Sequence, residues 1–198
     1  DARWVETTSG WGVSTGGLFP SLDGVYATPY RETLFTSKVN ATINSNNYLW
    51  VRYGRNENSQ PYGAGPLIAP SGWGDSKNKF NSINGNFNTV LGATALNEFI
   101  FQYADFGNNI LPLSTETRET FPNGVQVGQN PNTPQTTQQK KWQFRDDFSW
   151  TKSGMLGISH AFKAGVNWIH EPTLFITFNT GKGIIQYQHQ DNTLTGPL

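Results

Sequence analysis

The sequence predicts an all-β protein: an antiparallel up-and-down β-barrel, or part of one, in which short turns alternate with long loops. Apolar and polar residues alternate over several stretches, which is typical of strands with one apolar face. The sequence contains no long window rich in Ala, Leu, Glu and Lys, so no helix is predicted. Short and long polar connections follow one another along the chain.

Charge and composition exclude several classes of protein. The formal net charge is +0, from 14 basic and 14 acidic residues, so we expect no nucleic-acid partner. The absence of cysteine excludes disulfides, thiolate catalysis and thiolate zinc sites. The sequence contains no run of about 18 apolar residues, so no transmembrane helix is predicted. A transmembrane strand, in contrast, needs only about 9–11 residues with alternate positions apolar.

The chain divides into a loop-rich N-terminal segment, residues 1–30, and a strand region, residues 31–198, that is a single domain or a fragment. Alternating residues bounded by Gly, Pro, Asn and Ser define the predicted elements. In order these are strands 35–43 and 48–55 around a turn at 44–47, a long loop over 56–85, strands 87–92 and 97–106 around a turn at 93–95, a long loop over 107–139, strands 140–152 and 157–170 around a turn at Ser153–Gly154, and a strand pair formed by LFITFNT and GIIQYQHQ across Gly181–Gly183.

The order of the connections is more specific than any single strand. Loops of about 30 residues are uncommon in compact soluble domains. Outer-membrane barrels have short turns on the periplasmic side and long loops outside, which is the alternation predicted here.

Three stretches resemble barrel hairpins of TonB-dependent receptors, in particular the Oar-like group. They are RETLFTSKVNATINSNNYLWVRYGRNE, ALNEFIFQY and KKWQFRDDFSWTKSGMLGISHAFKAGVNW, and together they cover roughly residues 30–180 in the order of that family. The resemblance implies an outer-membrane protein that binds or takes up a nutrient such as a saccharide, siderophore or peptide. It also implies contact with outer-membrane lipid and energy from a TonB-type coupling protein.

The chain departs from that family in one respect. No plug domain or TonB box occurs within it, and a full receptor barrel has about 22 strands. We therefore expect one arc of such a barrel, with TonB coupling through a plug that this sequence lacks.

Asp146 and Asp147 form the most conspicuous acidic pair. Adjacent strand residues point to opposite faces, so the two carboxylates do not converge on one substrate and no catalytic residue is predicted. Asp147 is expected to pair with a Lys or Arg across the strands. Asp146 shares the face of Trp142, Phe144, Phe148 and Trp150, and a lipid-facing carboxylate requires a position near the rim or a partner.

Histidine and cofactor chemistry are not expected. His160, His170 and His189 are the only histidines, and the first two lie about 33 Å apart along one strand, too far to share a metal. No metal site and no cofactor are predicted.

The aromatic residues have two interpretations. In a barrel, Trp50, Tyr53, Trp142, Trp150 and Trp168 form girdles at the membrane interfaces. In a soluble protein the same residues pack in a core or stack on sugar rings. Trp4, Trp11 and Trp73 lie in Gly- and Ser-rich sequence and are the candidates for ligand contact.

Two alternatives remain open. The first is a secreted β-sandwich or jelly roll that binds or hydrolyses glycans, for which Glu98 with Asp147 or Glu171 is the only carboxylate pair to nominate. The second is a small structural barrel or assembly subunit. An enzymatic function is not predicted.

Overall fold

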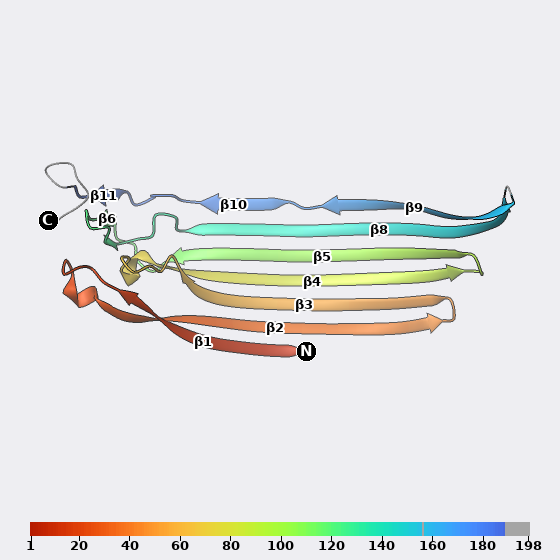
Figure 1. Cartoon of the computed structure of the whole chain (residues 1–198), viewed down its shortest axis with the longest axis horizontal. Coiled ribbons are helices and arrows are strands. Elements are labelled where there is room, and N and C mark those ends of the chain that lie inside the picture. Colours follow the sequence, from red (N-terminus) through yellow and green to blue (C-terminus); the bar gives the residue numbers. More distant parts are fainter. Residues whose placement is uncertain (156, 189–198) are drawn as a thin grey trace.

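The structure, a computed structural model, describes residues 1–155 and 157–188 as a long antiparallel sheet with a group of loops at one end (Figure 1). The eight-stranded sheet has the order β1-β2-β3-β4-β5-β8-β10, and β9 also pairs with β8; a three-stranded sheet has the order β11-β6-β7. The elements are β1 (Ala2–Val13), η1 (Pro20–Leu22), β2 (Gly24–Asn44), β3 (Asn47–Tyr62), η2 (Pro70–Gly72), β4 (Gly74–Leu91), β5 (Ala95–Pro112), β6 (Arg118–Thr120), β7 (Gln126–Val127), β8 (Gln135–Met155), β9 (Ile158–His170), β10 (Thr173–Thr177) and β11 (Ile184–Gln186).

The predicted all-β meander with alternating connections is confirmed. The short turns lie at one end of the long sheet and the loops at the other (Figure 1). Between β2 and β3, the Asn46 backbone N–H donates to the Asn44 side chain at 2.9 Å and closes the predicted asparagine turn. Between β4 and β5, Gly92 adopts φ 66°, a conformation that glycine reaches without strain.

The strands are longer than the sequence predicted. The long loops expected over 56–85 and 107–139 are wrong in extent, since the connections are residues 63–73 and 113–134. Residues 2–13, assigned to a loop-rich segment, form the edge strand β1. These added strand residues are mostly polar and lack a regular apolar alternation, and backbone pairing with neighbouring strands holds them extended.

The C-terminal elements also differ from the prediction. Within the described residues, which end at 188, LFITFNT and GIIQYQHQ do not pair: β10 continues β9 alongside β8, and β11 pairs in parallel with β6. The Pro172 carbonyl accepts from the Lys140 N–H at 3.1 Å, so the interrupted strand stays attached to β8. The turn predicted at Ser153–Gly154 is wrong, because β8 runs to Met155.

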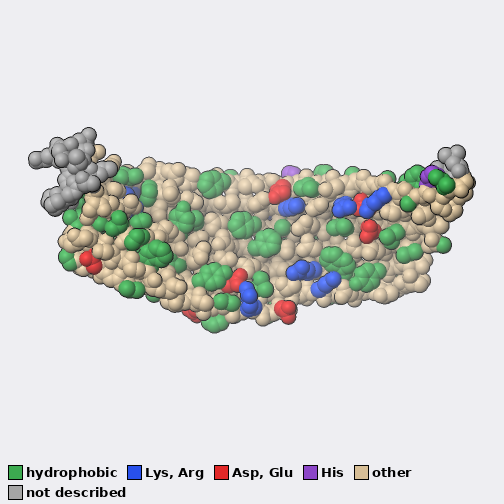
Figure 2. Space-filling view, in the orientation of Figure 1, with side chains coloured by type: hydrophobic (Ala, Val, Ile, Leu, Met, Phe, Trp, Pro, Cys, Tyr) green, Lys and Arg blue, Asp and Glu red, His purple; other side chains and the backbone are tan. Residues whose placement is uncertain are grey.

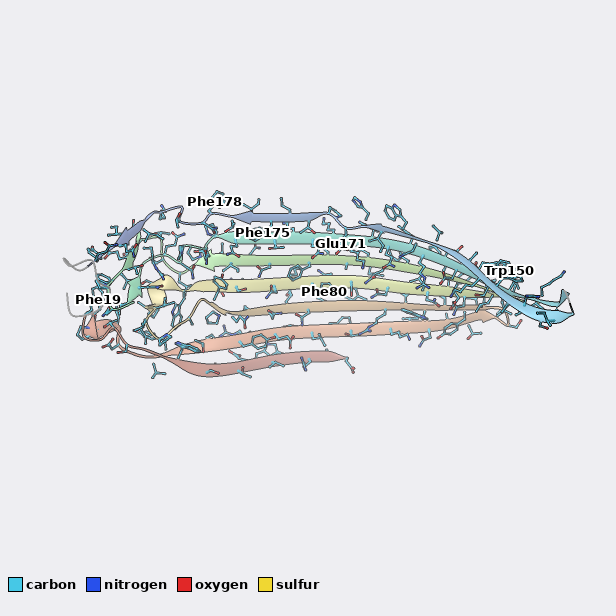
Figure 3. All side chains as sticks on the ribbon, turned by 45° about the horizontal axis from the view of Figure 1, so that its top comes forward. Phe19, Phe80, Trp150, Glu171, Phe175 and Phe178 are labelled. Carbon is cyan, nitrogen blue, oxygen red and sulfur yellow. The ribbon has the colours of Figure 1, made fainter. Side chains whose placement is uncertain are left out.

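The loops at one end pack into a compact unit that we call the loop cap, comprising residues 14–23, 63–73 and 113–134 together with β11. Trp73 is buried and donates its indole N–H to the Ile68 carbonyl at 2.9 Å. The Phe121 ring centroid lies 5.2 Å from that of Phe19. Figure 3 shows Phe19 at this end of the sheet and Trp150 at the opposite end. The buried apolar residues among those described are Val13, Ala69, Trp73, Ile110, Phe121 and Val125.

Candidate functional site

One face of the sheet is apolar over the part nearer the short turns, and we call this surface the apolar band. Opposed residues in an antiparallel pair share a face, so the register assigns each side chain to one side. On β8 the band covers residues 142–150, which span about 27 Å at about 3.4 Å per residue. Its members are Phe35, Val39, Ala41, Leu49, Val51, Tyr53, Ile83, Phe87, Phe99, Phe101, Tyr103, Trp142, Phe144, Phe148, Trp150, Phe162, Val166 and Trp168.

Aromatic rings mark both limits of the apolar band. At the limit nearer the loops, Tyr103 and Trp142 have ring centroids 4.4 Å apart, and Tyr53 lies in the same cross-strand row. At the limit nearer the turns, Trp150 stacks on Phe162 at 5.1 Å. Aromatic residues therefore lie at both limits of the apolar band.

The structure separates Trp50 from the other aromatic residues nominated for a girdle. The apolar side carries the other four, Tyr53, Trp142, Trp150 and Trp168. Trp168 lies one row closer to the turns than the row of Tyr53 and Trp142. Trp50 lies on the opposite face, where the Lys38 ammonium sits 4.9 Å from its ring centroid. The spacing between Trp50 and Tyr53 already contained this information, because strand residues three apart point to opposite faces.

Asp146 interrupts the apolar band near its middle. The side chain is half-buried and accepts a hydrogen bond from the Asn97 amide at 2.8 Å. It lies opposite Phe99 on β5 and Val166 on β9. The partner, and not a position at the rim, accommodates this carboxylate.

The other side of the sheet is the polar face, on which amides form a hydrogen-bonded ladder near the loop end. Asn56 donates to Glu32 at 2.7 Å, and Arg3 pairs with the same carboxylate at 2.7 Å. The hydrogen bond from Asn56 and then the bond from Arg3 hold the pKa of Glu32 below its usual value. The ladder continues across β3, β4 and β5 through the side chains of Asn58, Asn78 and Asn108.

A balanced ion network lies on the polar face over β5, β8 and β9. Asp147 pairs with Arg145 at 2.5 Å and with Lys163 at 3.3 Å, and Lys163 lies 3.9 Å from Glu98. Gly165 sits opposite Asp147, and a Cβ there would lie 2.3 Å from the carboxylate. Asp146 and Asp147 therefore occupy opposite faces, as the alternation predicted.

The tryptophans nominated for ligand contact occupy three different environments. Trp4 is 66% exposed on β1. It lines a hollow of about 730 Å³ on the loop side of the apolar band, and Arg31, Glu57 and Lys79 also line this hollow. Trp11 is an exposed residue of β1, and Trp73 is 3% exposed inside the loop cap. No single surface brings the three together.

The residues that the structure describes offer neither a metal site nor a membrane-spanning helix. In residues 1–155 and 157–188, no group of three or more His, Asp or Glu side chains is arranged to hold a metal ion. His160 stacks on Phe162 and His170 on Trp168, each at 5.9 Å, while His189 lies outside the described residues. No helix of this described part is long and apolar enough to cross a membrane.

Comparison with known proteins gives one match. A family model described as "Outer membrane beta barrel domain" matches residues 21–197. No curated protein matches the chain, and no solved structure does.

Proposed function

This chain belongs to the outer membrane β-barrel domain family, and from that premise we propose that it forms part of the wall of a TonB-dependent, Oar-like receptor. The protein belongs to the bacterial outer membrane, so lipid surrounds its apolar surface. In the proposal, the receptor takes up a saccharide, siderophore or peptide and has no enzymatic activity of its own. Tyr53, Trp142, Trp150 and Trp168 act as the membrane-interface aromatics.

The observation that carries the proposal is the contrast between the two faces of the same strand segments. The apolar band covers residues 142–150 of β8, close to the roughly 9–11 residues with which a tilted strand crosses an outer membrane. Behind it, the polar face presents amides and ion pairs, including Gln102 and Asp147. A sheet apolar on one side and polar on the other suits a wall between lipid and a water-filled lumen.

The TonB-dependent identity rests on the hairpin motifs of residues 31–57, 95–103 and 140–168. All three stretches form long strands of one meander, in the order that the motifs imply. The proposed energy source is a TonB-type protein acting through a plug domain outside these residues. Solute capture is assigned to the loop cap and to the lumenal end of the polar face.

Cysteine labelling tests the assignment of the two faces, since the chain has no cysteine of its own. Val39→Cys lies on the apolar band and Asn40→Cys on the polar face, one residue apart. In intact outer membranes, a water-soluble maleimide should label Asn40→Cys and spare Val39→Cys. A lipid-soluble quencher should quench a fluorophore attached at position 39 more strongly than one attached at position 40. Equal labelling of both positions by the aqueous reagent would overturn the wall assignment.

Uptake tests the coupling to TonB. Cells producing the full-length protein should accumulate at least one member of a labelled panel of oligosaccharides, ferric siderophores and oligopeptides. Disruption of TonB should abolish that accumulation while leaving the protein in the outer membrane. Accumulation that persists without TonB contradicts the receptor proposal and favours a passive pore.

A further inference from the structure

Two cations face each other on the polar face without a carboxylate between them. Lys38 of β2 lies directly opposite Arg52 of β3, and both side chains are exposed. Like charges directly opposite each other on neighbouring strands are destabilising. Among residues 1–155 and 157–188, neither side chain forms an ion pair, although the chain has as many acidic as basic residues.

Glu32, Glu98 and Asp147 of this face pair with other cations and lie outside the cross-strand row of Lys38 and Arg52, and Asp1, opposite Thr36 at the sheet edge, forms no ion pair among the described residues. Asp147 and Glu98 pair with Arg145 and Lys163 over β8 and β9, where the charges balance. Figure 2 shows mixed acidic and basic side chains over β8 and β9, and two neighbouring basic side chains over β2 and β3 with acidic side chains further along the sheet and at its edge. Lys38 and Arg52 therefore form a local concentration of positive charge, two adjacent cations without an ion pair of their own among the described residues.

The surroundings of the pair offer further donors. Asn84 and Gln102 continue the row of Arg52 across β4 and β5, and each carries an amide N–H₂ group. Trp50 lies beside the pair on the same face, with the Lys38 ammonium held over its ring at 4.9 Å. Opposed residues have Cβ atoms about 4.5–5.5 Å apart, so the ammonium and guanidinium groups can converge on one anionic group. Arginine binds carboxylate or phosphate through two parallel N–H donors.

We propose that Lys38 and Arg52 form a binding site for a carboxylate or phosphate group of the solute that passes along the polar face. This inference rests on the proposed function, because it requires the polar face to line the lumen. It narrows the solute class to anionic compounds, such as an acidic saccharide, an acidic peptide or a carboxylate siderophore. Trp50 then acts as a wall of this anion site.

Calorimetric titration of the purified full-length protein in a non-ionic detergent, at low ionic strength, tests the site with citrate and inorganic phosphate as probes and maltose as the neutral reference. The double variant Lys38→Gln/Arg52→Gln should bind the anions about tenfold or more weakly, because each charge-assisted bond is lost. The charge-matched control Arg55→Gln/Lys79→Gln removes two cations from the opposite face, where both pair with Glu57. It should bind as the wild type does.

Further variants separate a lost site from a lost fold. Lys38→Arg/Arg52→Lys keeps both charges and should retain anion binding, and heat-modifiable migration on a gel should show that every variant is folded. Absence of citrate and phosphate binding by the wild type, equal weakening in the control, or equal binding of maltose each overturns the inference. If Asn40→Cys is labelled from water in that case, the lumenal assignment survives and only the anion site fails; if it is shielded, the proposed function fails as well.

Discussion

The apolar band and the loop cap use the same kinds of side chain in opposite ways. In the loop cap, Trp73 is 3% exposed, whereas Trp168 in the band is 51% exposed. The loop cap buries its aromatic residues against protein, whereas the aromatic residues of the apolar band are exposed at the surface that faces lipid. Transfer of a large apolar side chain out of water contributes about 1.5–3 kcal/mol, so the band is stable only where lipid or detergent covers it. The loop cap therefore has a core of its own, whereas membrane lipid covers the apolar band.

The largest expected effect tests the cap. Trp73→Ala should destabilise the protein by about 3–5 kcal/mol, because truncation leaves a cavity among packed residues. Trp168→Ala should cost less, because lipid fills the space that the ring leaves. Urea unfolding in liposomes, followed by tryptophan fluorescence, measures both. A larger loss for Trp168→Ala would contradict the distinction between the two regions.

The band is tested by a charge placed in lipid. Val39 is 64% exposed at the middle of the band on β2. Val39→Arg should destabilise the folded barrel by about 2–4 kcal/mol, the cost of a basic side chain near the bilayer midplane. Asn40→Arg, the adjacent residue on the polar face, should change stability little. Equal losses in liposome refolding would show that this face does not meet lipid.

A smaller effect is expected where two strands approach closely in the ion network. A Cβ at position 165 would lie 2.3 Å from the Asp147 carboxylate and 2.7 Å from the Asp146 carbonyl oxygen. Gly165→Ala should therefore cost about 1–3 kcal/mol through overpacking. Gly107→Ala provides the control, because no atom lies within 4 Å of its added Cβ. The same unfolding measurement should separate the two alanine variants.

The smallest effect concerns pH at the amide ladder, outside the apolar band. The pKa of Glu32 is lowered in the folded protein by its hydrogen bond from Asn56 and by Arg3, so this carboxylate stabilises the fold above its unfolded pKa of about 4.5. That contribution is lost as pH falls through the lower folded value. Glu32→Gln should therefore unfold more readily than the wild type at pH 7 and equally readily at strongly acidic pH. A difference that is constant over this range excludes titration of Glu32 as its cause.

Much of the strand region was predictable from residue order. The alternation of residues 35–43 and the asparagine turn at 44–47 identified the first hairpin, and the opposite placement of Asp146 and Asp147 followed from strand geometry. The polar ends of the strands were not predictable in this way. Asn56, Asn58 and Asn78 carry no apolar alternation, and they are held in strands by backbone pairing and by side-chain hydrogen bonds from Asn56 to Glu32 and from Asn78 to Asn58.

The sequence by itself determined the apolar parts of the central strands, the alternation of short and long connections, and which residues within one strand share a face. Only the tertiary structure decided how the faces of neighbouring strands join. The turn pairs Asn44 with Asn47, and that register alone would set Lys38 against Tyr53. An irregularity between Thr42 and Asn44 shifts the pairing by one residue, so Lys38 meets Arg52 and Val39 meets Val51. A one-residue shift exchanges the faces of a strand, and this bulge is what makes one side continuously apolar and the other polar.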